Sequence, residues 1–211
     1  MDNYLGHADF AGKRVLDVGT ASGHLCFEME KRGAEVVAFD LAEDELWDFV
    51  PFTHQDVEET RAKVKPWLRK LHNGFWLAHA AMGSRAKVCH ARVYEPPTKL
   101  GKFDAALMGS ILLHLRDPML ALERIAALVT DTIIVTDMTP ALYFPLRTID
   151  WLPLPQFVRR HLRPGMYLQP GGLHNEDSMS WWQISPELII RHLKLMGFES
   201  PSYFNPSFIF R

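Results

Sequence analysis

The stretch KRVLDVGTASGHLCFEMEKRGAEVVAFD, residues 13–40, sets the architecture of the chain. It opens with an apolar run, residues 15–18, that ends in the glycine-bounded turn GTASG, residues 19–23. Such a run is typical of a parallel strand buried on both faces. A helix follows, which ends at Arg32 and Gly33, and VVAF, residues 36–39, supplies a second strand. We therefore predict a βαβ unit with a ligand-sized gap at the strand ends.

The turn differs from the dinucleotide fingerprint G-x-G-x-x-G, in which a pyrophosphate lies on the helix N-terminus. Its glycines are Gly19 and Gly23, with Ala21 between them, and Asp17 ends the preceding strand. A carboxylate there would repel a pyrophosphate but suits a cationic amine. Asp40, at the end of the second strand, can accept both hydroxyls of a ribose. The pattern indicates a nucleoside with a positive, phosphate-free tail; the alternative is a plain strand-to-helix turn in another α/β protein.

With these residues in place, the sequence resembles the class I S-adenosylmethionine-dependent methyltransferases. The matching segments are VLDVGTASG (15–23), the acidic strand end VVAFD (36–40) and GKFDAALMGSILLHLRDP (101–118). The resemblance covers nearly the whole chain. It implies a Rossmann-like α/β fold, with a seven-stranded, mostly parallel sheet and helices on both faces.

The resemblance also implies S-adenosyl-L-methionine as the cofactor. In relatives, the loop that follows the third strand lies beside the adenine ring and often carries Asp or Asn where this chain has Arg92. Because arginine has no acceptor, we expect backbone groups at Val93 to contact the adenine. The residues expected at the cofactor are Asp17, Gly19, Thr20, Ala21, Gly23, Asp40, Leu41, Arg92, Val93 and Ser110.

Composition fits a single soluble domain. The chain has 211 residues, of which 47% are hydrophobic and 23% charged, and a formal net charge of −2. This balance demands neither a nucleic acid nor a membrane partner. The sequence also contains no run of about 18 apolar residues, which is the length needed to span a bilayer. Cys26 and Cys89 are expected to be reduced, buried thiols, which favours a cytoplasmic location. No Cys/His grouping has zinc spacing, so we expect no metal site.

The rest of the pattern predicts three more parallel strands, two helices and a C-terminal antiparallel hairpin. The helices are expected to begin after Asp117 and Ser185, each of which is a cap residue followed by proline. The strands are expected at residues 86–92, 103–110 and 132–136, and the hairpin at 202–211.

Two insertions, residues 41–85 and 138–183, interrupt this single domain of residues 1–211. Both leave the sheet at the carboxyl ends of strands, where ligands bind in open α/β sheets, and both are rich in aromatic residues. We predict that they form one roof over the acceptor pocket; the alternatives are surface helices packed on the sheet and a homodimer interface. The residues expected to contact the substrate are Trp76, His79, His114, Trp181 and Trp182.

The first insertion is expected to hold three short helices. One begins near Glu43, and a second is capped by Asp56. The turn signal Asn73-Gly74 is expected to end the second helix, so that a third covers residues 75–82.

Methyl transfer requires alignment of the acceptor more than any fixed catalytic residue, and a base is useful only where the acceptor loses a proton. His114, just past the end of the central strand, is the best-placed candidate base. Its alternative role is to hydrogen bond a backbone carbonyl behind the site.

Three functions are compatible with the sequence. The first is methyl transfer to a hydroxyl or amine of a small molecule. The second is RNA methylation or carboxymethylation, because residues 8–23, 112–118 and 180–198 resemble a subgroup that includes the tRNA wobble-uridine alkylating enzyme and many small-molecule methyltransferases. Basic runs at 61–70 and 159–163 fit this second reading, although such runs are more often solvated helix faces. The third is non-catalytic S-adenosylmethionine binding.

Overall fold

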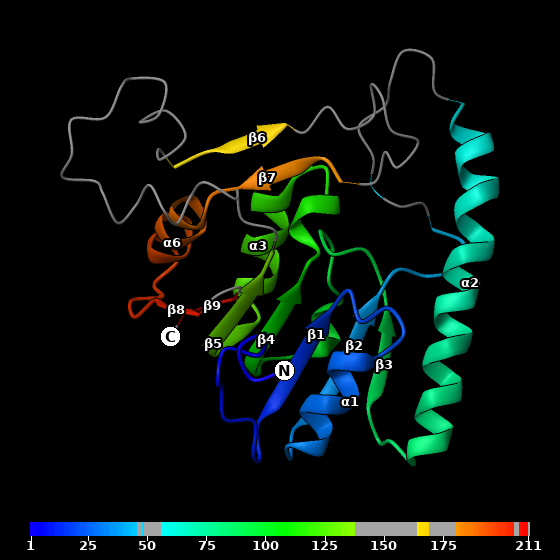
Figure 1. Cartoon of the computed structure of the whole chain (residues 1–211), viewed down its shortest axis with the longest axis horizontal. Coiled ribbons are helices and arrows are strands. Elements are labelled where there is room, and N and C mark those ends of the chain that lie inside the picture. The colour runs from blue at the N-terminus through cyan, green and yellow to red at the C-terminus, as the bar shows by residue number, and fades with distance from the viewer. Residues whose placement is uncertain (46–47, 49–55, 138–163, 169–179, 205–206, 211) are drawn as a thin grey trace.

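A computed structural model describes residues 1–45, 48, 56–137, 164–168, 180–204 and 207–210 (Figure 1). Its strands are β1 (Arg14–Val18), β2 (Glu35–Asp40), β3 (Lys87–His90), β4 (Phe103–Gly109), β5 (Val129–Thr136), β6 (Met166–Leu168), β7 (Trp182–Ile184), β8 (Ser202–Phe204) and β9 (Ser207–Phe210). Its helices are α1 (His24–Lys31), α2 (Val57–Met82), α3 (Pro118–Ala126) and α6 (Pro186–Leu195), with short 3-10 turns η1 (Thr98–Leu100) and η2 (Leu112–His114).

The main sheet has seven strands in the order β3-β2-β1-β4-β5-β9-β8. The first five are parallel, while β9 pairs antiparallel with β5 and β8 pairs antiparallel with β9. The predicted seven-stranded, mostly parallel sheet is therefore confirmed, including the C-terminal hairpin. The strand order reverses between β1 and β4, which is where an open α/β sheet binds its ligand.

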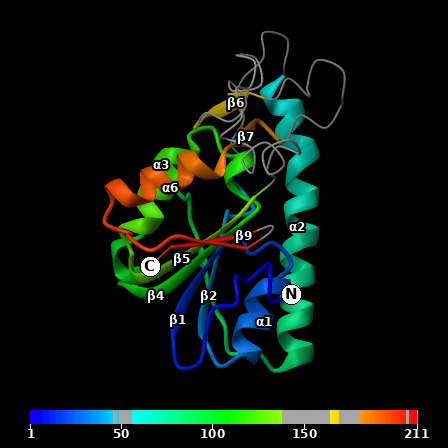
Figure 2. The same ribbon diagram turned by 60° about the vertical axis from the view of Figure 1, so that its left-hand side comes forward.

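Helices cover both faces of the sheet, as Figure 2 shows, with α1 and α2 on one side and α3 and α6 on the other. Alternate residues of β1 pack into the hydrophobic clusters on opposite faces of the sheet. Leu16 and Val18 belong to the cluster that includes α3 and α6, and Val15 belongs to the one that includes α1. Both faces of β1 are buried. This burial fixes the strand ends, and hence the edge at which the site forms.

Helix α2 corrects the prediction of separate helices across residues 56–82. It is continuous over 26 residues and passes through Asn73-Gly74 without a break. Asp56 caps it as predicted, because its side chain accepts hydrogen bonds from the backbone N–H groups of Glu58 and Glu59. Leu68 and Phe75 are both buried on the side of the helix facing the molecule. Burial of this stripe across the glycine outweighs the roughly 1 kcal/mol that glycine costs inside a helix.

Some predictions concern residues that the structure does not describe. These are most of the second insertion, at 138–163 and 169–179, and the middle of the first, at 46–47 and 49–55. The predicted roof and the basic run at 159–163 thus stay predictions. Within the described residues, no helix has both the length and the apolar character needed to cross a membrane.

Candidate functional site

The turn after β1 has a backbone conformation and close contacts that only glycine accommodates at two of its positions. Gly19 and Gly23 have φ of 76° and 86°, a region that favours glycine. A Cβ on Gly19 would lie 2.5 Å from Cδ1 of Ile111, and one on Gly23 would lie 2.5 Å from the ring of Phe27. Ala21 also has a positive φ, of 48°. The turn therefore brings bare backbone close to the end of β4.

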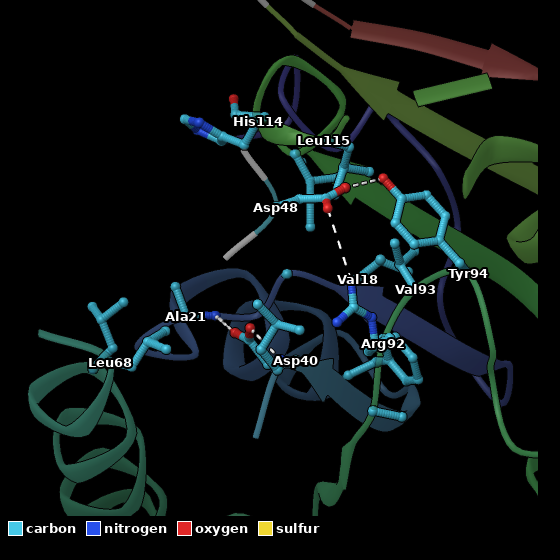
Figure 3. Close-up of a pocket in the computed structure, with 18 of the residues that line it drawn as sticks. Val18, Ala21, Asp40, Asp48, Leu68, Arg92, Val93, Tyr94, His114 and Leu115 are labelled. Atoms are coloured by element: carbon cyan, nitrogen blue, oxygen red, sulfur yellow. Dashed lines mark hydrogen bonds and ion pairs between the residues drawn. The ribbon is translucent and has the colours of Figure 1, made fainter. Parts of the chain in front are cut away.

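Asp40, at the end of β2, connects this turn to the next strand. Its Oδ2 accepts a hydrogen bond of 2.7 Å from the backbone N–H of Ala21, and its Oδ1 accepts one of 2.8 Å from that of Leu41 (Figure 3). Each carboxylate oxygen has a further lone pair, so the group can still accept two ligand hydroxyls.

Asp17 lies beneath the turn and does not line the cavity, contrary to the expectation that its carboxyl group faces the ligand. It is 2% exposed, and its Oδ2 accepts a 2.7 Å hydrogen bond from Oγ1 of Thr20. Burial raises its pKa to about 7, and the nearby carboxylate of Asp40 contributes in the same direction. Asp17 and Thr20 therefore act on the site through the turn that they support.

A cavity of about 260 Å³ opens at the carboxyl ends of the parallel strands. Trp67, Leu68 and Leu71 of α2 form one wall. The cavity brings together most of the residues predicted from sequence, namely Gly19, Ala21, Asp40, Leu41, Arg92, Val93, Ser110 and His114.

The β3 end of the cavity carries a charged network that the sequence did not indicate. Arg92 forms ion pairs with Glu45, at 3.3 Å, and with Asp48, at 3.9 Å. Asp48 also accepts hydrogen bonds from the hydroxyl of Tyr94 and, at 2.8 Å, from the backbone N–H of Arg116. Burial and the hydrogen bond to Asp48 raise the pKa of Tyr94. Asp48 and Tyr94 line the cavity, yet no local motif points to either.

The β4 end of the cavity is built on a strained residue. Ser110 has a φ of 50°, which is unusual for a side chain other than glycine. Its N–H donates a 2.6 Å hydrogen bond to the carbonyl of Thr136, and its Oγ lies 3.0 Å from the hydroxyl of Tyr4. Burial raises the pKa of Tyr4. Sequence reasoning missed Tyr4 because its partner is far away in the chain.

The two tryptophans expected at the substrate instead support the segment that carries His114. Trp181 is 4% exposed, and neither it nor Trp182 lines the cavity. The backbone N–H of Trp181 donates to the carbonyl of Leu113, and Nε1 of Trp182 donates to that of Leu115, both at 2.8 Å. These two carbonyls flank His114, which does line the cavity. The tryptophans are therefore positioned to orient the candidate base.

Trp76 and His79 lie away from the cavity, which corrects their expected contact with substrate. His79 donates from Nε2 to the carbonyl of Ala86, 3.1 Å away, just before β3 begins. That is the edge of the sheet opposite the cavity. Trp76 is 48% exposed and packs against Phe75 and His79. Because α2 is one continuous helix, its C-terminal part runs down past the sheet instead of rising over the site (Figure 1).

Among solved structures, this chain is similar to the 1,6-didemethyltoxoflavin-N1-methyltransferase of Burkholderia thailandensis with bound 1,6-didemethyltoxoflavin and S-adenosylhomocysteine. The TM-score is 0.52 with 15% identity, over 99% of this chain and 72% of that one. It is also similar to the magnesium protoporphyrin IX methyltransferase of Synechocystis PCC 6803 with bound S-adenosylhomocysteine, with a TM-score of 0.56 and 14% identity over 98% and 76% of the two chains. These likenesses show the fold.

Among curated proteins, the chain is similar to two ubiquinone biosynthesis O-methyltransferases. The one from Neisseria meningitidis serogroup A is 51% identical over 47 residues, which is 22% of this chain and 20% of that protein. The one from Azoarcus sp. (strain BH72) is 54% identical over 46 residues, with coverage of 22% and 20%. The match thus spans about a fifth of the length of these relatives.

The family model described as "Methyltransferase domain" matches residues 3–197, which is most of the chain. The matched range includes the glycine turn, Asp40 and the whole of the parallel sheet. The chain therefore belongs to the methyltransferase domain family, in its class I, S-adenosylmethionine-dependent form.

Proposed function

We propose that this protein transfers a methyl group from S-adenosyl-L-methionine to a hydroxyl or amine of a small molecule. The observation that carries the proposal is the cavity at the sheet's reversal point, with Asp40 at one side and His114 at another. The relatives named above act on small molecules, and two of them are O-methyltransferases, which favours a hydroxyl acceptor.

The residues around the cavity fit this cofactor. Asp40 has lone pairs for the two ribose hydroxyls, and the turn presents its backbone to the cavity at Gly19 and Ala21. The walls near β3 include Phe39 and Val93, which suit a flat purine ring. The methionine part then extends over the turn toward Ser110 and the β4 end.

When bound, S-adenosylmethionine supplies an electrophilic methyl group and a neutral thioether as leaving group. The protein aligns the acceptor oxygen or nitrogen with that methyl group, which alone can contribute several kcal/mol. His114 accepts the proton that the acceptor loses as its bond to the methyl carbon forms. Trp181 and Trp182 hold the backbone on either side of His114.

RNA methylation, the finer subgroup resemblance, is the second candidate. The described part of its basic runs lies on α2, where three of the five basic residues are paired with acids. Arg61 lies 3.7 Å from Glu58, Lys63 lies 2.8 Å from Glu59, and Arg69 pairs with Glu43. Such pairing reduces the positive charge that this face could offer to phosphates and therefore favours the small-molecule acceptor.

We further propose that residues 1–211 act as one cytoplasmic domain, with the insertion at 138–183 and the first part of the insertion at 41–85, up to Leu71, framing the acceptor side. Cys26 and Cys89 are both free thiols, which suits a reducing compartment. The roof over the acceptor pocket would then be formed within one chain. The rival arrangement is a homodimer, and analytical ultracentrifugation distinguishes the two by measuring the oligomeric state.

The test is S-adenosylhomocysteine formation with three acceptor pools: phenols and catechols, small amines, and bulk tRNA. We expect product with a small-molecule pool, and His114→Ala should lower kcat while leaving the Kd for S-adenosylhomocysteine nearly unchanged. Product with tRNA alone would replace the proposal with RNA methylation. Tight S-adenosylhomocysteine binding without turnover on any pool would indicate a non-catalytic domain.

A further inference from the structure

We propose that Asp48 recognises the 6-amino group of the adenine ring, and so makes the site selective for adenosyl over 6-keto purine ligands. This inference rests on the function proposed above, because it assumes that a nucleoside occupies the cavity. It assigns a role in base selection to a residue outside the loop that follows β3.

The position of the base follows from the shape of the cavity. With the ribose at Asp40, the ring extends either toward β3 or toward β4. The β4 end holds Ser110 and His114, the polar groups that face the reaction. The β3 end combines apolar walls, including Val93, which is 7% exposed, with the paired charges of Arg92 and Asp48. A flat purine ring is therefore best accommodated at the β3 end.

An adenine amino group at that end needs an acceptor, and the side chains of the loop after β3 offer little. Arg92 carries only donors. The Tyr94 hydroxyl donates its proton to Asp48. Glu45 pairs with Arg92 but does not line the cavity. Among the described side chains lining the β3 end, Asp48 is thus the carboxylate that can receive the amino group (Figure 3).

The hydrogen bonds of Asp48 leave one of its oxygens for a ligand. Oδ2 accepts from both the Tyr94 hydroxyl and the N–H of Arg116. Oδ1 lies 3.9 Å from the guanidinium of Arg92, which is beyond hydrogen-bond distance. The side chain is only 15% exposed, so it is held in place. A fixed oxygen that can only accept hydrogen bonds attracts an amino group, which donates. It repels a keto oxygen, because neither that oxygen nor the carboxylate oxygen carries a proton to share.

The test compares S-adenosylhomocysteine with S-inosylhomocysteine, which has a keto oxygen in place of the amino group. Calorimetry on the wild-type protein should give at least about tenfold tighter binding of the adenosyl ligand, as expected for loss of a hydrogen bond to a charged group. Asp48→Asn should lower this ratio several-fold or reverse it. Its side-chain oxygen can still accept from Tyr94 and Arg116, which turns the NH₂ group, a donor, toward the ligand.

Glu45→Gln is the matched control, because it removes the other carboxylate that pairs with Arg92 without altering the lining of the cavity. It should leave the binding ratio unchanged. A folded Asp48→Asn protein that keeps the wild-type ratio would overturn the inference, as would a Glu45→Gln protein with the same altered ratio.

A third ligand tests the inference on the wild-type protein alone, should Asp48→Asn fail to fold. The S-homocysteine derivative of purine riboside carries only hydrogen at C6, and it should bind about tenfold more weakly than S-adenosylhomocysteine. Equal binding of the three ligands would overturn the role of Asp48 and leave the proposed function intact. Binding of none would overturn the proposed function, and this inference with it.

Discussion

Asp17 is a buried carboxyl group whose protonation is coupled to folding. Burial raises its pKa from an ordinary value of 3.8 to about 7, partly opposed by the hydrogen bond from Thr20. Between these two values the folded chain keeps a proton that the unfolded chain has released. The stability contributed by Asp17 is therefore fully present below pH 3.8 and is lost as the pH rises through about 7.

Asp17→Asn should remove this dependence, because asparagine resembles the protonated acid. We expect the free energy of unfolding of the wild type, measured relative to that of Asp17→Asn by urea denaturation, to fall as the pH rises from about 4 to 7. A constant difference across this range would show that the carboxyl group ionises equally in both states.

Asp40 is expected to bind the ribose, and its removal should weaken cofactor binding specifically. Hydrogen bonds to a charged group are worth roughly 1.5–3 kcal/mol, so Asp40→Ala should raise the Kd of S-adenosylhomocysteine by about tenfold to a hundredfold. Asp40→Asn retains one oxygen acceptor and should have a smaller effect. Calorimetry checks the Kd, and circular dichroism checks the fold. An unchanged Kd in folded Asp40→Ala would contradict the ribose assignment.

At the scale of elements, the continuity of helix α2 predicts that Gly74 can be replaced by alanine with a gain in stability. Gly74 lies inside the helix, and a Cβ there would make only an ordinary contact, 3.8 Å from Cβ of Ser22. Gly74→Ala should therefore raise the free energy of unfolding by roughly 0.5–1 kcal/mol. Gly23→Ala is the contrast: with φ of 86° and a Cβ 2.5 Å from the ring of Phe27, it should destabilise. Urea denaturation of both variants measures the two signs.

Strand β7 connects the end of the second insertion to the segment that carries His114. Trp182→Phe keeps an aromatic side chain, with a smaller ring, but removes the hydrogen bond from Nε1 to the carbonyl of Leu115. We expect kcat to fall several-fold while the Kd of S-adenosylhomocysteine stays within about twofold, because the loss reaches His114 and leaves the nucleoside end intact. Trp76→Phe, on the far part of α2, is the control and should leave kcat unchanged. A parallel rise in Kd would favour a general structural role for Trp182.

At the scale of the whole molecule, the sheet and half of the site could be predicted because their signals are local. A strand, its glycine turn and the acid at the next strand end lie within residues 13–40, and parallel pairing brings them together. The same holds for Ser110 and His114, which follow the end of β4 directly.

The remaining features depend on contacts that no local pattern encodes. Asp48 and Tyr94 are 46 positions apart, and Tyr4 and Ser110 are 106 apart. The turn predicted at Asn73-Gly74 was wrong because a buried helical stripe decides that region more strongly than one glycine. Trp76 and His79 were then misplaced with it, since the helix carries them past the sheet. Trp181 and Trp182 were assigned from their aromatic character, which says nothing about the direction in which they point.

The choice of cofactor is a property of the assembled site, and thermal shifts can test it. A ligand that binds only the folded state at 100 times its Kd adds about 2.7 kcal/mol of stability, which corresponds to a rise in Tm of roughly 5–10 °C for a domain of this size. S-adenosylhomocysteine should produce such a rise. NAD should not, because Ala21 stands where the dinucleotide fingerprint has the glycine that lets the backbone approach a pyrophosphate. Adenosine, which lacks both the amino acid tail and the phosphates, should bind more weakly than S-adenosylhomocysteine and yet better than NAD. A shift with NAD and none with S-adenosylhomocysteine would mean that the turn accepts a pyrophosphate, and the assignment of the cofactor would be wrong.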